Sequence, residues 1–97
     1  MEINFEHIGS SLGTRVLAKN VRLEIEKSLK SGSFVTFNFN NVRLVSHSFA
    51  DECFGKLLMT WSIADLKANT TFVGANSVIK KTIAFTLEER ANNLELV

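Results

Sequence analysis

Residues 34–39 read Phe-Val-Thr-Phe-Asn-Phe, and residues 45–52 read Val-Ser-His-Ser-Phe-Ala-Asp-Glu. The first stretch is rich in aromatic and β-branched residues and alternates only in part, which is typical of a central strand covered on both faces. The second stretch leads into an amphipathic helix that we place at residues 49–67. Together they predict one strand-helix unit of an α/β domain.

The same alternation extends to both sides of this unit. Upstream, residues 3–6 alternate as a short strand, and residues 12–29 have the four-residue spacing of a helix. Downstream, residues 70–74 resemble a strand, and a third helix starts near Asn76. Because consecutive parallel strands need a long connection, this order predicts an α/β fold with a mostly parallel or mixed sheet and three helices. The helical stripes are formed by Leu17, Val21, Ile25 and Leu29, by Ala50, Cys53, Phe54, Leu57, Leu58, Trp61 and Ala64, and by Ile79, Ile83 and Leu87.

Two segments fall outside this pattern. Residues 40–45 are expected to form a connecting loop, with Leu44 and Val45 tucked against the sheet edge. Residues 92–97 are expected to fray or to add a short edge segment.

Length and composition limit the classes of function. The chain has 97 residues, of which 45% are hydrophobic, so we expect a single domain over residues 1–97. Its formal charge of +1 and lack of long charge runs argue against nucleic-acid binding. No stretch approaches the roughly 18 apolar residues of a membrane span, and we expect a cytoplasmic protein that does not bind a membrane. A single cysteine, Cys53, excludes an internal disulfide and is expected to be buried and inert.

The candidate site lies where the second helix begins. Ser46, His47, Ser48, Asp51 and Glu52 place hydroxyl, imidazole and carboxylate groups there, and we expect them in solvent. One interpretation is structural: Ser48 caps the helix, and Asp51 and Glu52 occupy its first turn. A second is that a serine here is phosphorylated.

Other chemistries receive little support from the sequence. The glycines form neither a dinucleotide-binding motif nor a phosphate-binding loop, and no zinc-ligand set is present, so no cofactor or metal is expected. Phe54 and Trp61 are expected in the core, and Lys80, Lys81 and Arg90 on a solvated face.

Residues 45–52, followed by Phe54-Gly55-Lys56-Leu57, resemble the bacterial STAS-like domains of unknown function. Residues 12–15 and 74–76 add to the likeness, as do Ile83, Thr86, Leu87 and Arg90. The wider STAS group includes anti-sigma-factor antagonists, which dock on ATP-binding kinase-type proteins and are switched by phosphorylation of a serine at this helix start. The resemblance therefore implies a partner-switch role. This chain has Asn38 where the group usually has Asp, and His47 at the phosphorylated position, with Ser46 and Ser48 beside it.

The sequence leads to one main functional hypothesis and two alternatives. The main one is a non-enzymatic regulatory module that binds a protein partner, an ATP-binding kinase or anti-sigma-type protein, through Ser46, His47, Ser48, Asp51 and Glu52. The first alternative is a small hydrolase or phosphoryl-transfer enzyme that uses His47, Ser48 and Asp51. The second is a homodimer or other oligomer that docks through Leu44 and Val45.

Overall fold

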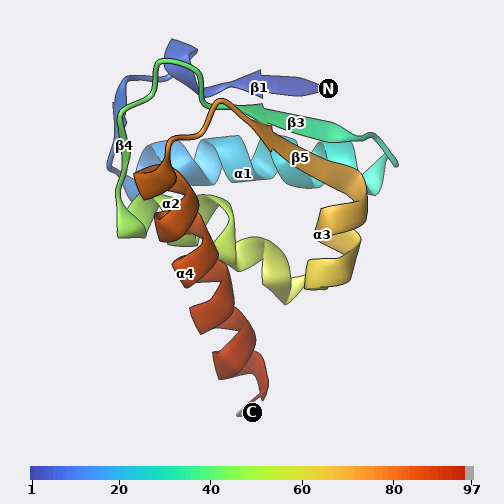
Figure 1. Ribbon diagram of the computed structural model, residues 1–97. Coiled ribbons are helices and arrows are strands. Elements are labelled where there is room, and N and C mark those ends of the chain that lie inside the picture. The colour runs from blue at the N-terminus through green and yellow to red at the C-terminus, as the bar shows by residue number, and fades with distance from the viewer. Residues whose placement is uncertain (96–97) are drawn as a thin grey trace.

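A computed structural model of the chain describes residues 1–95, which form two parallel sheets and four α-helices (Figure 1). The strands are β1 (Glu2–Asn4), β2 (Ser11–Leu12), β3 (Val35–Asn38), β4 (Leu44–Val45) and β5 (Thr70–Val73). The helices are α1 (Arg15–Lys30), α2 (His47–Cys53), α3 (Ile63–Asn69) and α4 (Ser77–Glu95). The structure also contains two 3-10 turns, η1 (Phe5–His7) and η2 (Gly55–Met59).

The main sheet has the order β1-β3-β5, and both pairings are parallel. The predicted central strand is therefore confirmed, since β3 lies between the other two. Phe37 is in register with Ile3 on one side and Phe72 on the other. Each crossover contains helical segments, as a parallel connection requires.

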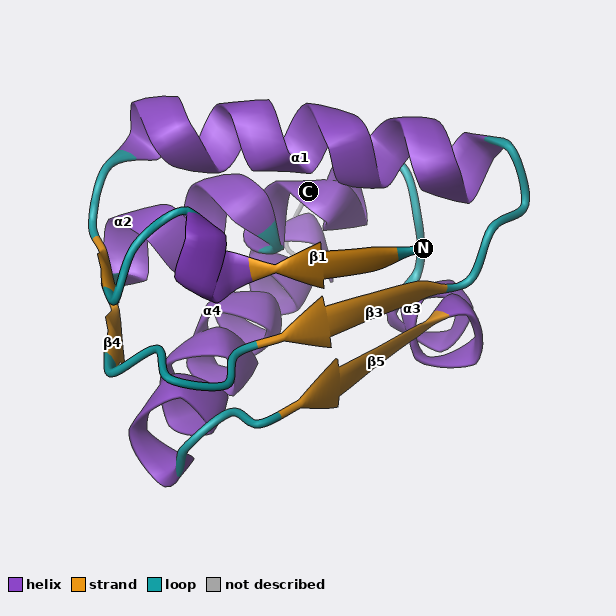
Figure 2. Cartoon of the chain, turned by 90° about the horizontal axis from the view of Figure 1, so that it is seen from above, coloured by secondary structure: helices purple, strands orange, loops and turns teal. Residues whose placement is uncertain are grey.

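Within residues 1–95, helices cover one face of this sheet and leave the other open, so the expectation that β3 is covered on both faces is wrong. In Figures 1 and 2, α1, α2 and α4 all lie on the same side of the three strands. Val35 and Phe37 are buried on that side, whereas Thr36 and Asn38, which alternate with them, are half-buried on the other. Successive strand side chains point to opposite faces, so the alternation follows directly from the one-sided cover.

The predicted helix over residues 49–67 is also wrong as a continuous element. It is divided into α2, η2 and α3, which explains why four helices are described rather than three. A new N-terminus forms at Ser62, whose hydroxyl accepts the Asp65 N–H, while the Asp65 carboxylate accepts the Ser62 N–H. Such a capping box stabilises a helix start and thereby separates α3 from the preceding turn. Phe54 is buried as expected, and Trp61 is half-buried against the core.

The first helix starts later than expected because Leu12 belongs to β2, not to the helix. The side chain of Thr14 caps α1, and Val21 and Ile25 lie in the core while Leu17 is largely exposed. The residues expected to form a loop at 40–45 include β4, which pairs in parallel with β2. In α4, Ile79 and Ile83 are buried as the periodicity predicts.

The last helix is longer than the sequence suggests. The expected frayed or edge segment at residues 92–97 is helical through Glu95, and residues 96 and 97 lie outside the described part.

Aromatic rings fill the centre of the core beneath the sheet. Phe5 stacks on Phe39 with ring centroids 4.3 Å apart, and Phe54 meets Phe37 edge to face at 5.1 Å. All four side chains are almost completely buried. Edge-to-face and stacked ring pairs add to the stabilisation from burial alone, so these residues anchor α2 under β3.

Gly74, which joins β5 to α4, has a backbone that requires glycine. Its φ of +72° is left-handed, and a Cβ there would overlap the side chain of Asn40 and approach the Asn40 backbone nitrogen to 2.8 Å. Gly32 has a similar φ of +81°, but a Cβ there would meet nothing within 4 Å. An alanine at Gly32 would therefore introduce backbone strain alone, whereas an alanine at Gly74 would introduce both strain and steric overlap.

We expect Gly74→Ala to destabilise the fold more than Gly32→Ala does. Gly32→Ala introduces only left-handed strain, which costs about 1–2 kcal/mol. Gly74→Ala adds the overlap with Asn40, which costs about 1–3 kcal/mol more. Urea unfolding of both variants measures the difference in unfolding free energy. Equal losses of unfolding free energy in the two variants would show that Asn40 moves away freely.

Candidate functional site

The N-terminus of α2 is capped by Ser46, not by Ser48 as expected. The Ser46 hydroxyl oxygen accepts the Phe49 N–H at 3.0 Å and donates to the Gly13 carbonyl, also at 3.0 Å. The helix begins at His47, which places Ser48 inside the first turn with an exposed side chain. The two serines of the candidate site therefore differ: Ser46 holds the turn together, and Ser48 faces solvent.

Asp51 lies in a cluster of cations, and the expectation that it faces solvent is wrong. The residue is only 6% exposed. Arg90 holds the carboxylate with both branches of its guanidinium group, from Nε to Oδ1 at 2.6 Å and from Nη2 to Oδ2 at 2.8 Å. Arg15 donates to Oδ2 at 3.0 Å. Two-pronged pairing of this kind is the strongest geometry available between a guanidinium and a carboxylate.

Glu52 is also buried, with 5% exposure, which again contradicts the expected solvent position. Its carboxylate accepts a hydrogen bond from Arg22 Nη2 at 2.9 Å, lies 2.9 Å from Lys56 Nζ, and is 3.3 Å from Arg15 Nη1. Arg22 Nε donates to the Glu52 backbone carbonyl at 2.9 Å. Each oxygen of the Glu52 side chain therefore has a cationic partner.

These charges form one carboxylate–guanidinium network, which consists of Asp51, Glu52, Arg15, Arg22, Arg90 and Lys56. Hydrogen bonds from Arg90, followed by those from Arg15, lower the pKa of Asp51 from 3.8 to about 2 against the opposing effect of burial. Burial also opposes ionisation of Glu52, but hydrogen bonds from Lys56 and Arg22 leave its pKa lowered. The network ties α2 to α1 and α4 while both carboxylates stay ionised.

Sequence reasoning missed the arginines of this network, although a signal was present. Arg90 lies seven residues after Ile83 and four after Thr86, both of which are buried, so it projects from the inner side of α4. Arg22 similarly lies between Ala18 and Ile25 on the buried stripe of α1. The expectation that Arg90 belongs to a solvated face is wrong, whereas Lys80 and Lys81 are exposed as expected.

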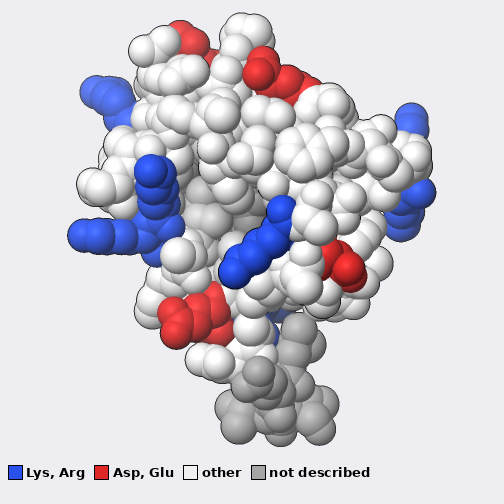
Figure 3. All heavy atoms as spheres, turned by 45° about the vertical axis from the view of Figure 1, so that its right-hand side comes forward, with Lys and Arg blue, Asp and Glu red and all other residues white. Residues whose placement is uncertain are grey.

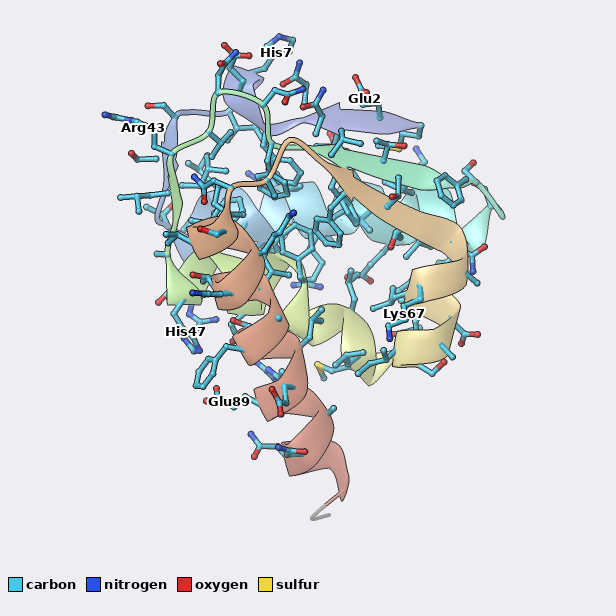
Figure 4. All side chains as sticks on the ribbon, viewed as in Figure 1. Glu2, His7, Arg43, His47, Lys67 and Glu89 are labelled. Atoms are coloured by element: carbon cyan, nitrogen blue, oxygen red, sulfur yellow. The ribbon has the colours of Figure 1, made fainter. Side chains whose placement is uncertain are left out.

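The exposed part of the site joins α2 to α4. His47 Nε2 lies 3.5 Å from Glu89 Oε1, and the imidazole ring is 5.7 Å from the ring of Phe85. His47 and Glu89 point from α2 and α4 toward the same side of the molecule (Figure 4). Phe85 is 56% exposed, so a large apolar side chain lies at the surface beside His47.

The remaining chemistry of the site is limited. Asp51 hydrogen-bonds to Arg90 and Arg15, while the carboxylate nearest to His47 is that of Glu89. Cys53 is buried, and burial raises the pKa of its thiol. Within residues 1–95, no group of three or more His, Cys, Asp or Glu side chains is arranged to hold a metal ion.

Comparison with protein families settles the classification. The family model described as a STAS-like domain of unknown function matches residues 18–80. The chain belongs to this family. No curated protein and no solved structure matches it. The matched part of this STAS-like domain includes residues 45–52, on which the resemblance depends, but neither Arg15 nor Arg90.

A helix that spans a membrane must be both long and apolar. Over residues 1–95, no helix combines the length and apolar character of a membrane span.

We expect acid to weaken the domain as Asp51 becomes protonated. The folded state has a pKa near 2 at this residue against an ordinary value of 3.8. Stability from the network is therefore complete above about pH 4 and is lost as pH falls toward 2, with a loss of about 2 kcal/mol from Asp51. Urea unfolding at several pH values measures the slope, which should be shallower in Asp51→Asn. An unchanged slope in that variant would contradict the assignment.

Replacing Arg90 should lower the free energy of unfolding, because the buried Asp51 carboxylate would lose its main cationic partner. Arg90→Met keeps the length of the side chain but leaves Asp51 with Arg15 alone, so we expect a loss of about 2–3 kcal/mol of unfolding free energy. The pKa of Asp51 should rise, which carboxyl carbon NMR measures directly. Arg43→Met is the matched control, because Arg43 is exposed. Equal effects of the two variants would show that the Arg90 contacts contribute nothing specific.

Proposed function

We propose that this STAS-like domain is a regulatory interaction module, not an enzyme, and that it docks on a protein partner through one surface. This α2–α4 surface consists of His47 and Ser48 in α2 and Phe85 and Glu89 in α4. The partner is an ATP-binding protein of the kinase or anti-sigma type. Family membership and the exposure of Phe85 beside His47 support the proposal.

The composition of the α2–α4 surface favours protein binding. Aromatic residues near charged and polar groups are enriched at the centres of interfaces, and Phe85 supplies a large apolar anchor. Val78 is 53% exposed and precedes Phe85 by two helical turns on the same face of α4. Val78 therefore offers a second apolar contact on α4, separated from Phe85 by Lys81 and Thr82.

The carboxylate–guanidinium network supports the surface from below. Asp51 and Glu52 follow Ser48 in the same short helix, and they fix it to α1 and α4 through buried charges. In this proposal Asp51 and Glu52 position the surface and do not contact the partner. A rigid helix lowers the entropy cost of docking.

Ser48 is the better candidate for a phosphorylation switch. Ser46 already uses its hydroxyl to cap α2 and to bind the Gly13 carbonyl, so a phosphate there would disrupt the turn. Ser48 is exposed in the first turn, and a phosphate would add a charge of about −1.5 to −2 to the α2–α4 surface. That charge would lie close to His47 and would change binding without unfolding the helix.

The hydrolase alternative has weaker geometric support. A Ser-His mechanism needs a third group that orients the imidazole, and the proposed Asp51 is engaged by two arginines. Glu89 approaches His47 at 3.5 Å but is itself largely exposed. The absence of turnover on a broad esterase and phosphatase panel would eliminate this alternative.

We expect Ser48→Asp to weaken partner binding by about tenfold through the new charge at the interface. Isothermal titration against an ATP-binding protein of the histidine-kinase type, preferably encoded next to this chain, measures the affinity. Asn20→Asp adds the same charge on an exposed position of α1 and serves as the control. The proposal fails if the wild type forms no complex, or if Ser48→Asp and Phe85→Ser both bind like the wild type.

A further inference from the structure

The outer edge of β5 is open. Among residues 1–95, the strand pairs with β3 alone, so one side of its backbone has no neighbouring strand in the described part of the main sheet. The Val73 carbonyl accepts the Phe39 N–H at 2.8 Å, which directs the backbone groups of Val73 toward β3. Because backbone direction alternates along a parallel strand, the N–H and C=O of Phe72 point to the open side. This edge can accept another extended chain.

Nothing in the sequence of this edge protects it. Natural edge strands carry lysine, proline or a bulge that blocks pairing, whereas residues 70–73 read Thr-Thr-Phe-Val. Residues 68–79 contain no charged side chain at all. The edge is therefore suited to binding an extended segment.

An apolar groove lies directly beside this edge. It has a volume of about 320 Å³, and its walls come from β5, from the turn after it and from α4. The lining residues are Phe72, Ala75, Lys80, Ile83, Ala84 and Leu87. In a strand added beside β5, alternate side chains would point toward the helix side of the sheet, where the groove lies. The groove is large enough for one aliphatic side chain.

Lysine side chains lie beside the groove, and Figure 3 also shows Asp or Glu side chains farther out on the same face. Lys80 belongs to its lining, and Lys67 lies in α3 just before β5. Lys67 extends from α3 toward the space between α3 and α4 in Figure 4. Figure 3 shows a hollow on this face with blue Lys or Arg side chains on both sides of it. An acidic ligand fits this arrangement.

We propose that the β5 edge and its groove bind an extended acidic peptide by strand addition, separately from the α2–α4 surface. The peptide backbone pairs with the N–H and C=O of Phe72, an aliphatic side chain enters the groove, and flanking carboxylates approach Lys80 and Lys67. A second copy of this chain is the less favourable occupant. Antiparallel self-pairing about Phe72 would bring α3, with Lys67, beside the Lys80 end of the partner's groove.

A fluorescein-labelled peptide tests the proposal. The probe has a central leucine between valines and is flanked by aspartate and glutamate, and binding is followed by anisotropy with the full chain. We expect saturable binding, and about tenfold weaker binding for Lys80→Glu and for Ala84→Glu, which places a charge in the groove. Lys19→Glu, on an exposed position of α1, should bind like the wild type. Thermal unfolding of each variant confirms that it is folded.

Three further measurements identify the mode of binding and its charge preference. Methylation of the peptide nitrogens should abolish binding if backbone pairing carries it, and the amide exchange of Phe72 should slow when the normal probe is bound. A probe with lysine in place of the acidic residues should bind at least about tenfold more weakly.

The proposal is overturned if the acidic probe fails to bind or if Lys80→Glu and Ala84→Glu leave its affinity unchanged. If the wild type instead forms concentration-dependent dimers, and Lys80→Glu and Ala84→Glu disrupt them, the edge binds a second copy of this chain. Ser48→Asp and Phe85→Ser should leave probe binding intact, so a failure here is distinct from a failure of the α2–α4 surface.

Discussion

The pairing of Asp51 with Arg90 is the contact on which the arrangement of this domain depends. It joins a helix of seven residues, too short to be stable by itself, to the long C-terminal helix. Gly55 lies next to it, where a Cβ would come within 2.8 Å of Asp51 Oδ1 and 3.1 Å of Arg90 Cγ. Glycine at residue 55, at the start of η2, therefore leaves room for the ion pair between α2 and α4.

The fold could be predicted in outline because hydrophobic periodicity reports burial. The spacing of Ile79 and Ile83 located α4, and the composition of residues 34–39 located β3. The break near residue 60 was harder, since buried Leu57 and Leu58 suit a 3-10 turn as well as an α-helix. The capping residues Ser62 and Asp65 were a readable signal for that break. So was the polar alternation at Thr36 and Asn38, which indicated an uncovered face.

The site could be located from the sequence but not described from it. Ser46, His47 and Ser48 lie at the N-terminus of α2, and His47 and Ser48 face solvent as expected. Asp51 and Glu52 lie beyond the first turn, so the expectation that they occupy it is wrong. The burial of Asp51 could not be deduced locally, because its partners lie 36 and 39 residues away. A carboxylate near the start of a helix fits a solvent position equally well until its guanidinium partners are identified. The edge of β5 likewise becomes visible only when the order of strands is known.

The network also affects where this domain can be divided. The family match spans residues 18–80, yet Arg15 precedes that range and Arg90 follows it. A fragment cut to the matched range would keep Asp51 and lose both of its cationic partners, together with Ile83 from the core. The matched range is therefore shorter than the segment that contains the complete carboxylate–guanidinium network.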